Sequence, residues 1–201
     1  MTDTEKKCRD RSAHRRALFI LGTALLCASL LCTPAVSRAG SEQEQHLFDA
    51  AYNGNLSKVQ ALIARGVNVN ARGSYGLTAL IMAAQEGRKD MVKLLIEKGA
   101  DVNAKADNGT TALIQAVIQS HPEMLALLLE KGADVNASKT NGETALIIAA
   151  ETDQPDIVAM LLEKGADMNA KDASGKTAMD YAKDGNYVSV LQRLRGAGAK
   201  E

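Results

Sequence analysis

A repeat of thirty-three residues is the feature that most constrains what this chain of 201 residues can fold into. Four glycines recur at that spacing, and each opens the same short motif, Gly-x-Thr-Ala followed by Leu or Met; they are Gly76, Gly109, Gly142 and Gly175. Residues 76–108 and 109–141 are identical at eighteen of thirty-three aligned positions. A fixed period of this length predicts stacked supersecondary units, because no single unit can bury its apolar face alone.

One unit, residues 76–108, predicts two helices and a loop. Thr78 precedes a short apolar helix, and Gly87 ends it because glycine costs about 1 kcal/mol in a helix interior. Asp90 is placed to cap a second helix over residues 91–98. The residues expected to be buried are Leu80, Ala83 and Ala84 on the first helix and Val92, Leu94, Leu95 and Ile96 on the second.

The second helix is expected to end at Gly99, which can adopt the left-handed conformation found just past helix ends. Residues 100–109 are rich in Asn, Asp and Gly and predict a turn-based hairpin, here called a finger, that leads into the next unit. The expected fold class is an all-α solenoid, a stack of about five helix-turn-helix units with β-hairpin fingers. The units are expected at about residues 43–75, 76–108, 109–141, 142–174 and 175–199.

The first thirty-nine residues have a different character and predict a signal peptide. A basic stretch through Arg16 precedes an apolar run from Ala17 to Cys32, and Pro34 and a small-residue pattern ending at Ala39 follow it. We expect cleavage after Ala39, a domain over residues 40–201, and a periplasmic or secreted location. The apolar run is shorter than the roughly twenty residues that span a hydrocarbon core, so an uncleaved anchor is the weaker alternative.

Two export routes fit this segment. The sequence Arg15-Arg16-Ala17-Leu18-Phe19 resembles the twin-arginine export signal, whereas the same arginines could merely supply charge to a general secretory signal. Lipid anchoring is disfavoured because Leu26 and Leu31, rather than small residues, precede the two cysteines of the run.

Charge and cysteine usage exclude several classes of function. Residues 40–201 carry 17 basic and 21 acidic side chains, and such a chain lacks the clustered basic face that nucleic-acid binding needs. Cys8, Cys27 and Cys32 all precede residue 40. The predicted domain therefore has no disulfide, no thiolate nucleophile and no sulfur ligand for a metal.

The repeated motifs resemble the ankyrin repeat over about residues 43–199. Gly-x-Thr-x-Leu, the paired small residues, Leu-Leu and Gly-Ala-Asp-Val-Asn-Ala stand in family order three times over. The first unit lacks the leading turn, as an amino-terminal cap would, and the last places charge on Arg193, Arg195 and Lys200 where a further repeat would dock. The resemblance implies a stack that binds other proteins through its concave face.

Two departures from the family pattern are structural. Thr-Pro-Leu-His appears here as Thr-Ala-Leu-Ile, so an apolar ladder of Ile81, Ile114 and Ile147 replaces the histidines that bond to neighbouring loops in the family. Proline occurs instead at Pro122 and Pro155, just inside the second helix, where a missing N–H would be unpaired anyway.

The predicted domain offers little for catalysis or metal binding. His46 and His121 are far apart and lack a metal-binding spacing, and Gly175-Lys176-Thr177 lacks the earlier glycine of a phosphate-binding loop. A row of carboxylates is expected to hold turns through local hydrogen bonds rather than to bind cations; it comprises Asp101, Asp134 and Asp167. We expect no cofactor, no metal and no catalytic residue.

Residues that vary between units while the framework repeats predict the partner-binding surface. They are Tyr52, Tyr75, Leu77, Gln85, Asn108, Thr110, Ile118, Gln119, Asn141 and Glu143. Aromatic and aliphatic anchors carry most interface energy, which favours the first three units as its centre. The alternative is that solitary exposed apolar residues have no function.

The third unit departs most from its siblings. The neighbouring units have Met or Ile at the position of Gln115, Ala at the position of Val117, and Gln or Glu at the position of Ile118. The first two departures are explained internally if the Gln115 amide bonds a neighbouring backbone group and Val117 compensates in volume. Ile118 is harder to explain in that way and is expected to lie at the centre of the partner site.

The sequence therefore predicts an exported, monomeric, non-catalytic module that binds another protein, with no nucleic acid and no membrane contact after cleavage. A narrower alternative is an inhibitor, immunity factor or accessory protein of a periplasmic enzyme. A third reading, from a different class, is an enzyme with an unrecognised carboxylate site.

Overall fold

Five helix pairs follow one another along residues 42–198, which are the residues that the computed structural model describes. The predicted signal peptide, the three cysteines and Lys200 lie outside them. The pairs are α2 (Glu42–Tyr52) with α3 (Leu56–Ala64), α4 (Ala79–Gln85) with α5 (Lys89–Glu97), α6 (Ala112–Ile118) with α7 (Pro122–Glu130), α8 (Ala145–Glu151) with α9 (Pro155–Glu163), and α10 (Ala178–Asp184) with α11 (Val188–Gly196).

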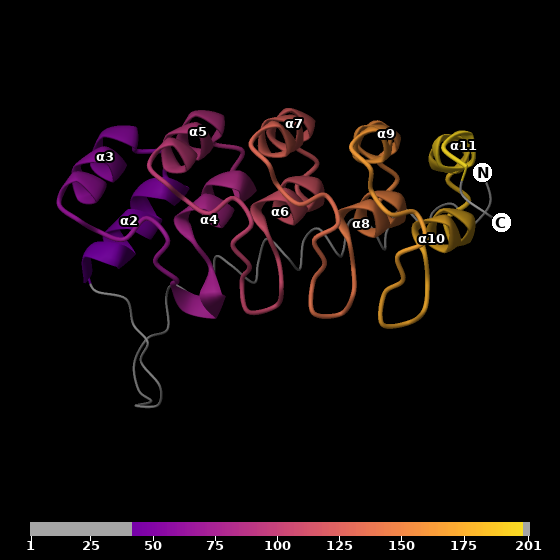
Figure 1. Ribbon diagram of the computed structural model, residues 1–201, viewed down its shortest axis with the longest axis horizontal. Coiled ribbons are helices and arrows are strands. Elements are labelled where there is room, and N and C mark those ends of the chain that lie inside the picture. The colour runs from indigo at the N-terminus through magenta and orange to yellow at the C-terminus, as the bar shows by residue number, and fades with distance from the viewer. Residues whose placement is uncertain (1–41, 199–201) are drawn as a thin grey trace, which may run out of the picture. The chain divides into compact units, whose positions relative to one another are not determined.

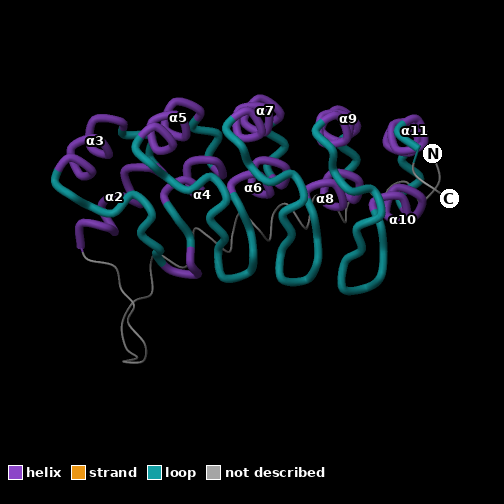
Figure 2. Tube along the Cα trace, viewed as in Figure 1, coloured by secondary structure: helices purple, strands orange, loops and turns teal. Residues whose placement is uncertain are grey.

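The two helices of each pair belong to two separate rows. Figure 1 shows α2, α4, α6, α8 and α10 in an inner row, and the second helix of each pair in an outer row. The fingers, drawn mostly as teal loops in Figure 2 with a short purple helical turn (Ser74–Gly76) in the first, all extend to the same side of the inner row. The predicted all-α repeat stack is confirmed.

A threonine begins four of the inner helices. The side-chain oxygen of each accepts a hydrogen bond from the backbone N–H three residues on, at 3.2–3.3 Å; the four are Thr78, Thr111, Thr144 and Thr177. Each bond satisfies one of the N–H groups that a helix start leaves without a partner. The threonine of the repeated motif is thus the helix cap.

The start of the second helix differs from the prediction in one unit. Pro122 and Pro155 occupy the first turns of α7 and α9, as expected. Asp90, however, is not a cap, because α5 begins at Lys89, two residues before the predicted start, and Arg88 precedes it without a side-chain cap bond. The N–H of Arg88 bonds to the carbonyl of Ala83 at 2.9 Å, which closes the turn early and leaves Asp90 inside the helix.

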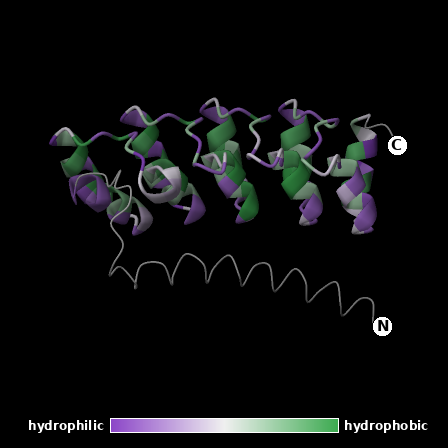
Figure 3. Ribbon diagram, turned by 90° about the horizontal axis from the view of Figure 1, so that it is seen from below, coloured by the Kyte–Doolittle hydropathy of each residue, from purple (hydrophilic) through white to green (hydrophobic). Residues whose placement is uncertain are grey.

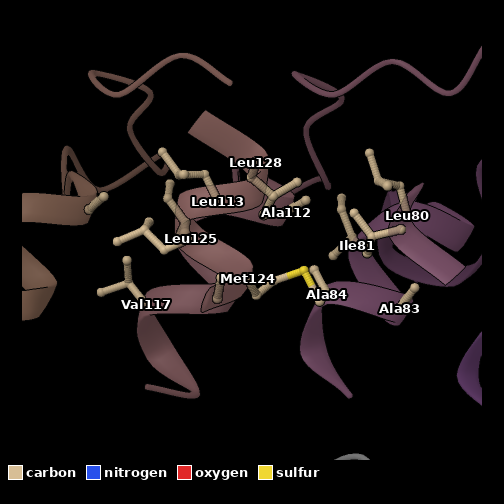
Figure 4. Close-up of a cluster of buried hydrophobic side chains, with 14 of the residues drawn as sticks. Leu80, Ile81, Ala83, Ala84, Ala112, Leu113, Val117, Met124, Leu125 and Leu128 are labelled. Atoms are coloured by element: carbon tan, nitrogen blue, oxygen red, sulfur yellow. The ribbon is translucent and has the colours of Figure 1, made fainter. Parts of the chain in front are cut away.

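The core lies between the two rows and continues from one unit to the next. Leu80, Ala83 and Ala84 are buried as predicted, and the isoleucine ladder of Ile81, Ile114 and Ile147 is buried throughout. Figure 4 shows Met124 of α7 reaching toward Ala84 of the preceding unit. In Figure 3 the helices carry most of the hydrophobic colour, whereas the connecting loops are mostly hydrophilic.

The β-hairpin pairing expected of the fingers is not shown in the described part of the chain. No strand is assigned within residues 42–198, and one isolated antiparallel bridge joins Ser138 and Thr144. Each finger closes in a short turn that leaves room for few hydrogen bonds between its own two arms. One of these bonds runs from Ala106 N to Thr110 O at 2.8 Å. Neighbouring fingers bond to each other instead, for example from Thr140 N to Asn108 O at 2.9 Å.

Asparagines bridge the bases of successive units. The Asn103 amide accepts from the backbone N–H of Asp134 at 2.8 Å and donates to the carbonyl of Gly132 at 3.3 Å. Asn70 and Asn136 make the same pair of bonds at their own junctions. The carboxylates of Asp101, Asp134 and Asp167 accept backbone N–H groups two residues on, so their predicted role in holding turns is confirmed.

Candidate protein-binding surface

In the fifth unit, a finger residue meets two residues of the inner helix α10. Lys176 Nζ lies 2.7 Å from the Asp184 carboxylate and 5.2 Å from the centre of the Tyr181 ring. Lys176 is the finger residue after the framework glycine, and the other two lie on α10. We call these three positions a surface triad.

The repeat spacing assigns one triad to each unit that has a finger before it. The triads are Leu77, Met82 and Gln85; Thr110, Gln115 and Ile118; Glu143, Ile148 and Glu151; and Lys176, Tyr181 and Asp184. The first unit, which has no preceding finger, contributes Asp49 and Tyr52 at the two helix positions. Together these residues are called the inner surface, of which Thr110, Gln115 and Ile148 are largely buried.

The chemistry of the inner surface changes along the stack. The triads of the second and third units contain no charged side chain. In the fourth unit Glu143 forms an ion pair with Lys139 at 2.6 Å, and in the fifth Lys176 pairs with Asp184. A partner that covers the later units must therefore compete with bonds that the protein already makes, whereas the second and third units offer neutral surface.

Two of the predicted binding residues are large and exposed. Tyr52 is 43% exposed and Tyr75 is 66% exposed. Tyr75 lies at the tip of the first finger with φ 58°, and its carbonyl accepts the N–H of Asp107 at 2.9 Å. This bond between neighbouring fingers fixes the backbone of Tyr75, so the exposed ring is attached to a backbone position that is held in place.

The other predicted residues divide into exposed, half-buried and buried groups. Asn108 and Asn141 are exposed, and each accepts a backbone N–H within its own finger turn. The half-buried residues are Leu77, Gln85, Ile118, Gln119 and Glu143. Thr110 is only 5% exposed, and its carbonyl accepts the N–H of Ala106 within the same finger, so little of the residue is open to a partner.

Ile118 and Gln115 differ in part from their predicted roles. Ile118 is half-buried and packs against the core, so its apolar side chain serves the scaffold as well as the surface. Gln115 is buried and forms no side-chain hydrogen bond within residues 42–198, contrary to the internal bond suggested for it. Val117 is fully buried, in agreement with a role in filling volume.

A cluster in the fifth unit was missed from the sequence. The Asp172 carboxylate accepts the hydroxyl of Tyr181 at 2.5 Å, the hydroxyl of Ser174 at 2.7 Å and the backbone N–H groups of Ser174 and Lys176. These bonds, led by that from Tyr181, lower the pKa of Asp172 to about 2. A tyrosine where other units have Met, Gln or Ile was the available signal.

We expect Asp172→Asn to lower the melting temperature near neutral pH but to have little effect near pH 2. The folded-state pKa lies below the ordinary value of 3.8, so the stabilisation is present above about pH 4 and is lost as the pH falls toward 2. Thermal melts of both proteins across this range test it. A difference in melting temperature that persists unchanged at pH 2 would show that the charge of Asp172 is not responsible.

A shallow hollow between the bases of the first two fingers is already occupied by structural bonds. It is lined in part by Asn70, Arg72, Asp101 and Lys105. Arg72 donates to the carbonyl of Lys105 and to the carboxylate of Asp107, and Asn70 belongs to the asparagine bridge. These groups hold neighbouring fingers together.

Neither a metal cluster nor a membrane span is found within residues 42–198. No group of three or more His, Cys, Asp or Glu side chains there could hold a metal ion. Over the same stretch, every helix is too short or too polar to cross a bilayer. His46 is exposed, and His121 packs against Gly87 of the preceding unit.

Comparison with protein families identifies the class. A family model described as ankyrin repeats (3 copies) matches residues 47–139, and one described as ankyrin repeats (many copies) matches residues 128–182. The chain belongs to the ankyrin-repeat family, whose members are in general protein-protein interaction modules without catalytic activity. No curated protein matches the chain in a sequence comparison.

Proposed function

We propose that this protein is an exported, non-catalytic module that binds another protein through the inner surface, with the centre of binding on the first three units. The observation that carries the proposal is the contrast along that surface. Neutral triads in the second and third units adjoin two exposed tyrosines, whereas the fourth and fifth units hold paired charges.

The free-energy cost of removing charged groups from water supports this placement of the binding centre. Covering an ion pair such as Lys139 with Glu143 removes charged groups from water, and the attraction between them only partly compensates. Aromatic anchors such as Tyr52 and Tyr75 carry binding energy without that cost. Both side chains lie at the amino-terminal end of the stack, next to the uncharged triads.

Ile118→Gln is expected to weaken partner binding by at least about 2 kcal/mol, the energy that marks a dominant interface residue. Glutamine stands at the equivalent position in the second unit as Gln85, so the scaffold accepts it there. The partner would be captured from a cell-envelope extract with the full-length protein, identified, and titrated against both proteins by calorimetry. Its identity also tests the alternative of an inhibitor, immunity or accessory protein, which requires the partner to be an enzyme.

A matched control keeps this test specific. Val188 is an exposed apolar residue on α11, 57% exposed and outside the inner surface, so Val188→Gln should leave binding unchanged. Thermal melts should show that both variants remain folded. Equal binding by wild type and Ile118→Gln would place the site elsewhere, for example at the finger tips around Asn108 and Asn141.

Export is the second part of the proposal and rests on the first thirty-nine residues. We expect mass spectrometry of the native protein to find a chain that begins at Gly40; a chain that retains residues 18–32 would contradict cleavage. Replacing Arg15 and Arg16 together by Lys should block export by the twin-arginine route but not by the general secretory route, because the charge is kept. Cell fractionation distinguishes the two outcomes.

A further inference from the structure

The third unit carries two buried polar side chains that the fold does not use. Five polar residues are buried within residues 42–198, and three of them, Thr78, Thr111 and Thr144, are helix caps. The other two are Thr110 and Gln115, which belong to the same surface triad. No side-chain hydrogen bond is formed by either residue within the described part of the chain.

The amide of Gln115 costs stability where it stands. The residue is 7% exposed, so its amide reaches little water, and no protein group within residues 42–198 replaces the hydrogen bonds that it loses. The equivalent residues are Met82 and Ile148, so an apolar side chain serves the scaffold at this position. The glutamine therefore needs an explanation other than folding.

The amide is not sealed inside the protein. Gln154 Oε1 is the only fully enclosed side-chain nitrogen or oxygen within residues 42–198 that lacks a partner, so the Gln115 amide still reaches solvent. The equivalent Tyr181 extends toward its finger and donates its hydroxyl to Asp172. In the third unit the residue equivalent to Asp172 is Ala106, whose side chain cannot accept a hydrogen bond.

The surroundings of Gln115 favour a neutral amide as its partner. Its triad and that of the second unit are uncharged, and the nearest charged triad residue along the chain, Glu143, is held by Lys139 with side chains only 18% and 22% exposed. The Glu86 carboxylate, beside the triad of the second unit, accepts the Gln85 amide at 3.2 Å, so an ion that paired with Glu86 would lose its hydration and displace that bond. A glutamine amide offers a donor and an acceptor side by side, which matches the N–H and C=O of a peptide group.

We propose that Gln115 anchors the main chain of an extended segment of the partner protein, with an apolar side chain of that segment packed over Leu77, Met82 and Ile118. This rests on the proposed function of the inner surface. The segment is extended because a helix already uses its own N–H and C=O groups, whereas an extended chain presents them to a binding surface.

The test uses displayed random peptides of about twelve residues, selected on the full-length protein. The strongest binder is synthesised, and each of its amides is N-methylated in turn, which removes one N–H. Gln115→Met should weaken the unmodified peptide at least about tenfold, and one N-methylated peptide should lose a similar factor. That peptide should bind wild type and Gln115→Met alike, because both changes remove the same bond.

Thermal stability and a glutamine outside the inner surface provide the controls. Gln115→Met should melt at the same temperature as wild type or higher, since an unpaired polar group is removed. If it does not fold, Gln115→Ile takes its place, because isoleucine occupies the equivalent position as Ile148. Gln60→Met, at an exposed position on the outer-row helix α3, should leave peptide affinity within about twofold of wild type.

Other outcomes overturn the proposal in distinguishable ways. Failure to enrich any peptide contradicts a main-chain anchor. The anchor is also contradicted if, at every N-methylated position, the loss of affinity from N-methylation and the loss from Gln115→Met multiply, because the two changes then act independently. If Ile118→Gln abolishes peptide binding but Gln115→Met does not, the inner surface binds and the anchor is wrong. If neither variant affects binding, the inner surface itself is wrong.

Discussion

Leu128→Ala is expected to lower the free energy of unfolding by about 2 to 5 kcal/mol, the range for truncating a fully buried leucine. Leu128 lies on α7 in the middle unit and has no exposed surface. Figure 4 shows it among Leu113 and Leu125, between the inner and outer rows. Removing its branched end leaves a cavity that neighbouring helices cannot close without breaking their packing on the next unit.

Chemical denaturation of wild type and variant measures this loss. Lys131→Ala is the control, because Lys131 is exposed just after the same helix and its removal should change stability by only a few tenths of a kcal/mol. A loss below about 1 kcal/mol for Leu128→Ala would contradict its placement in the core. The dependence on denaturant also shows whether the array still unfolds as one unit, since each unit is stabilised by its neighbours.

Gly109→Ala is expected to destabilise the protein by at least about 1 kcal/mol more than Gly132→Ala. Both glycines have positive φ, 81° and 87°, so both variants carry the cost of about 1 to 2 kcal/mol for a side chain in that conformation. Only Gly109 also meets a neighbour. A Cβ there would lie 2.8 Å from the backbone of Lys139 and Thr140, whereas one at Gly132 would have no atom within 4 Å.

The comparison separates conformational strain from contact between fingers. The backbone of the next finger cannot move away from Gly109 without disturbing the bond from Thr140 to Asn108. Equilibrium unfolding of the two variants beside wild type measures the difference. Equal losses would mean that the fingers are free to separate and that their cross-finger bonds contribute little.

Much of the fold could be predicted from the sequence because the repeat copies its local signals. A helix start after Thr78, a helix end at Gly99 and an apolar isoleucine ladder were all predicted from the repeat and recur from unit to unit. Asp90 shows where local signals are insufficient. An aspartate is a good cap in isolation, but the turn closed by Arg88 and Ala83 starts the helix before it.

The inner surface could be predicted only in part. Variation between units indicated Tyr52, Tyr75 and the neighbouring positions, but it also indicated Thr110, which is buried. Variation between units marks positions where the repeat does not fix the residue type, and some of these positions are buried. Exposure depends on how closely a finger lies against its helix, and a single unit does not specify that distance.

The sequence by itself determined the unit, its helices and the residues that face the core, because those features depend on contacts a few residues apart. Only the tertiary structure decided which polar groups have partners. Asn103 bonds to groups 29 and 31 residues away, and Arg72 reaches one 35 residues away. No such group within residues 42–198 reaches Gln115, so its amide remains without a partner in that part of the chain.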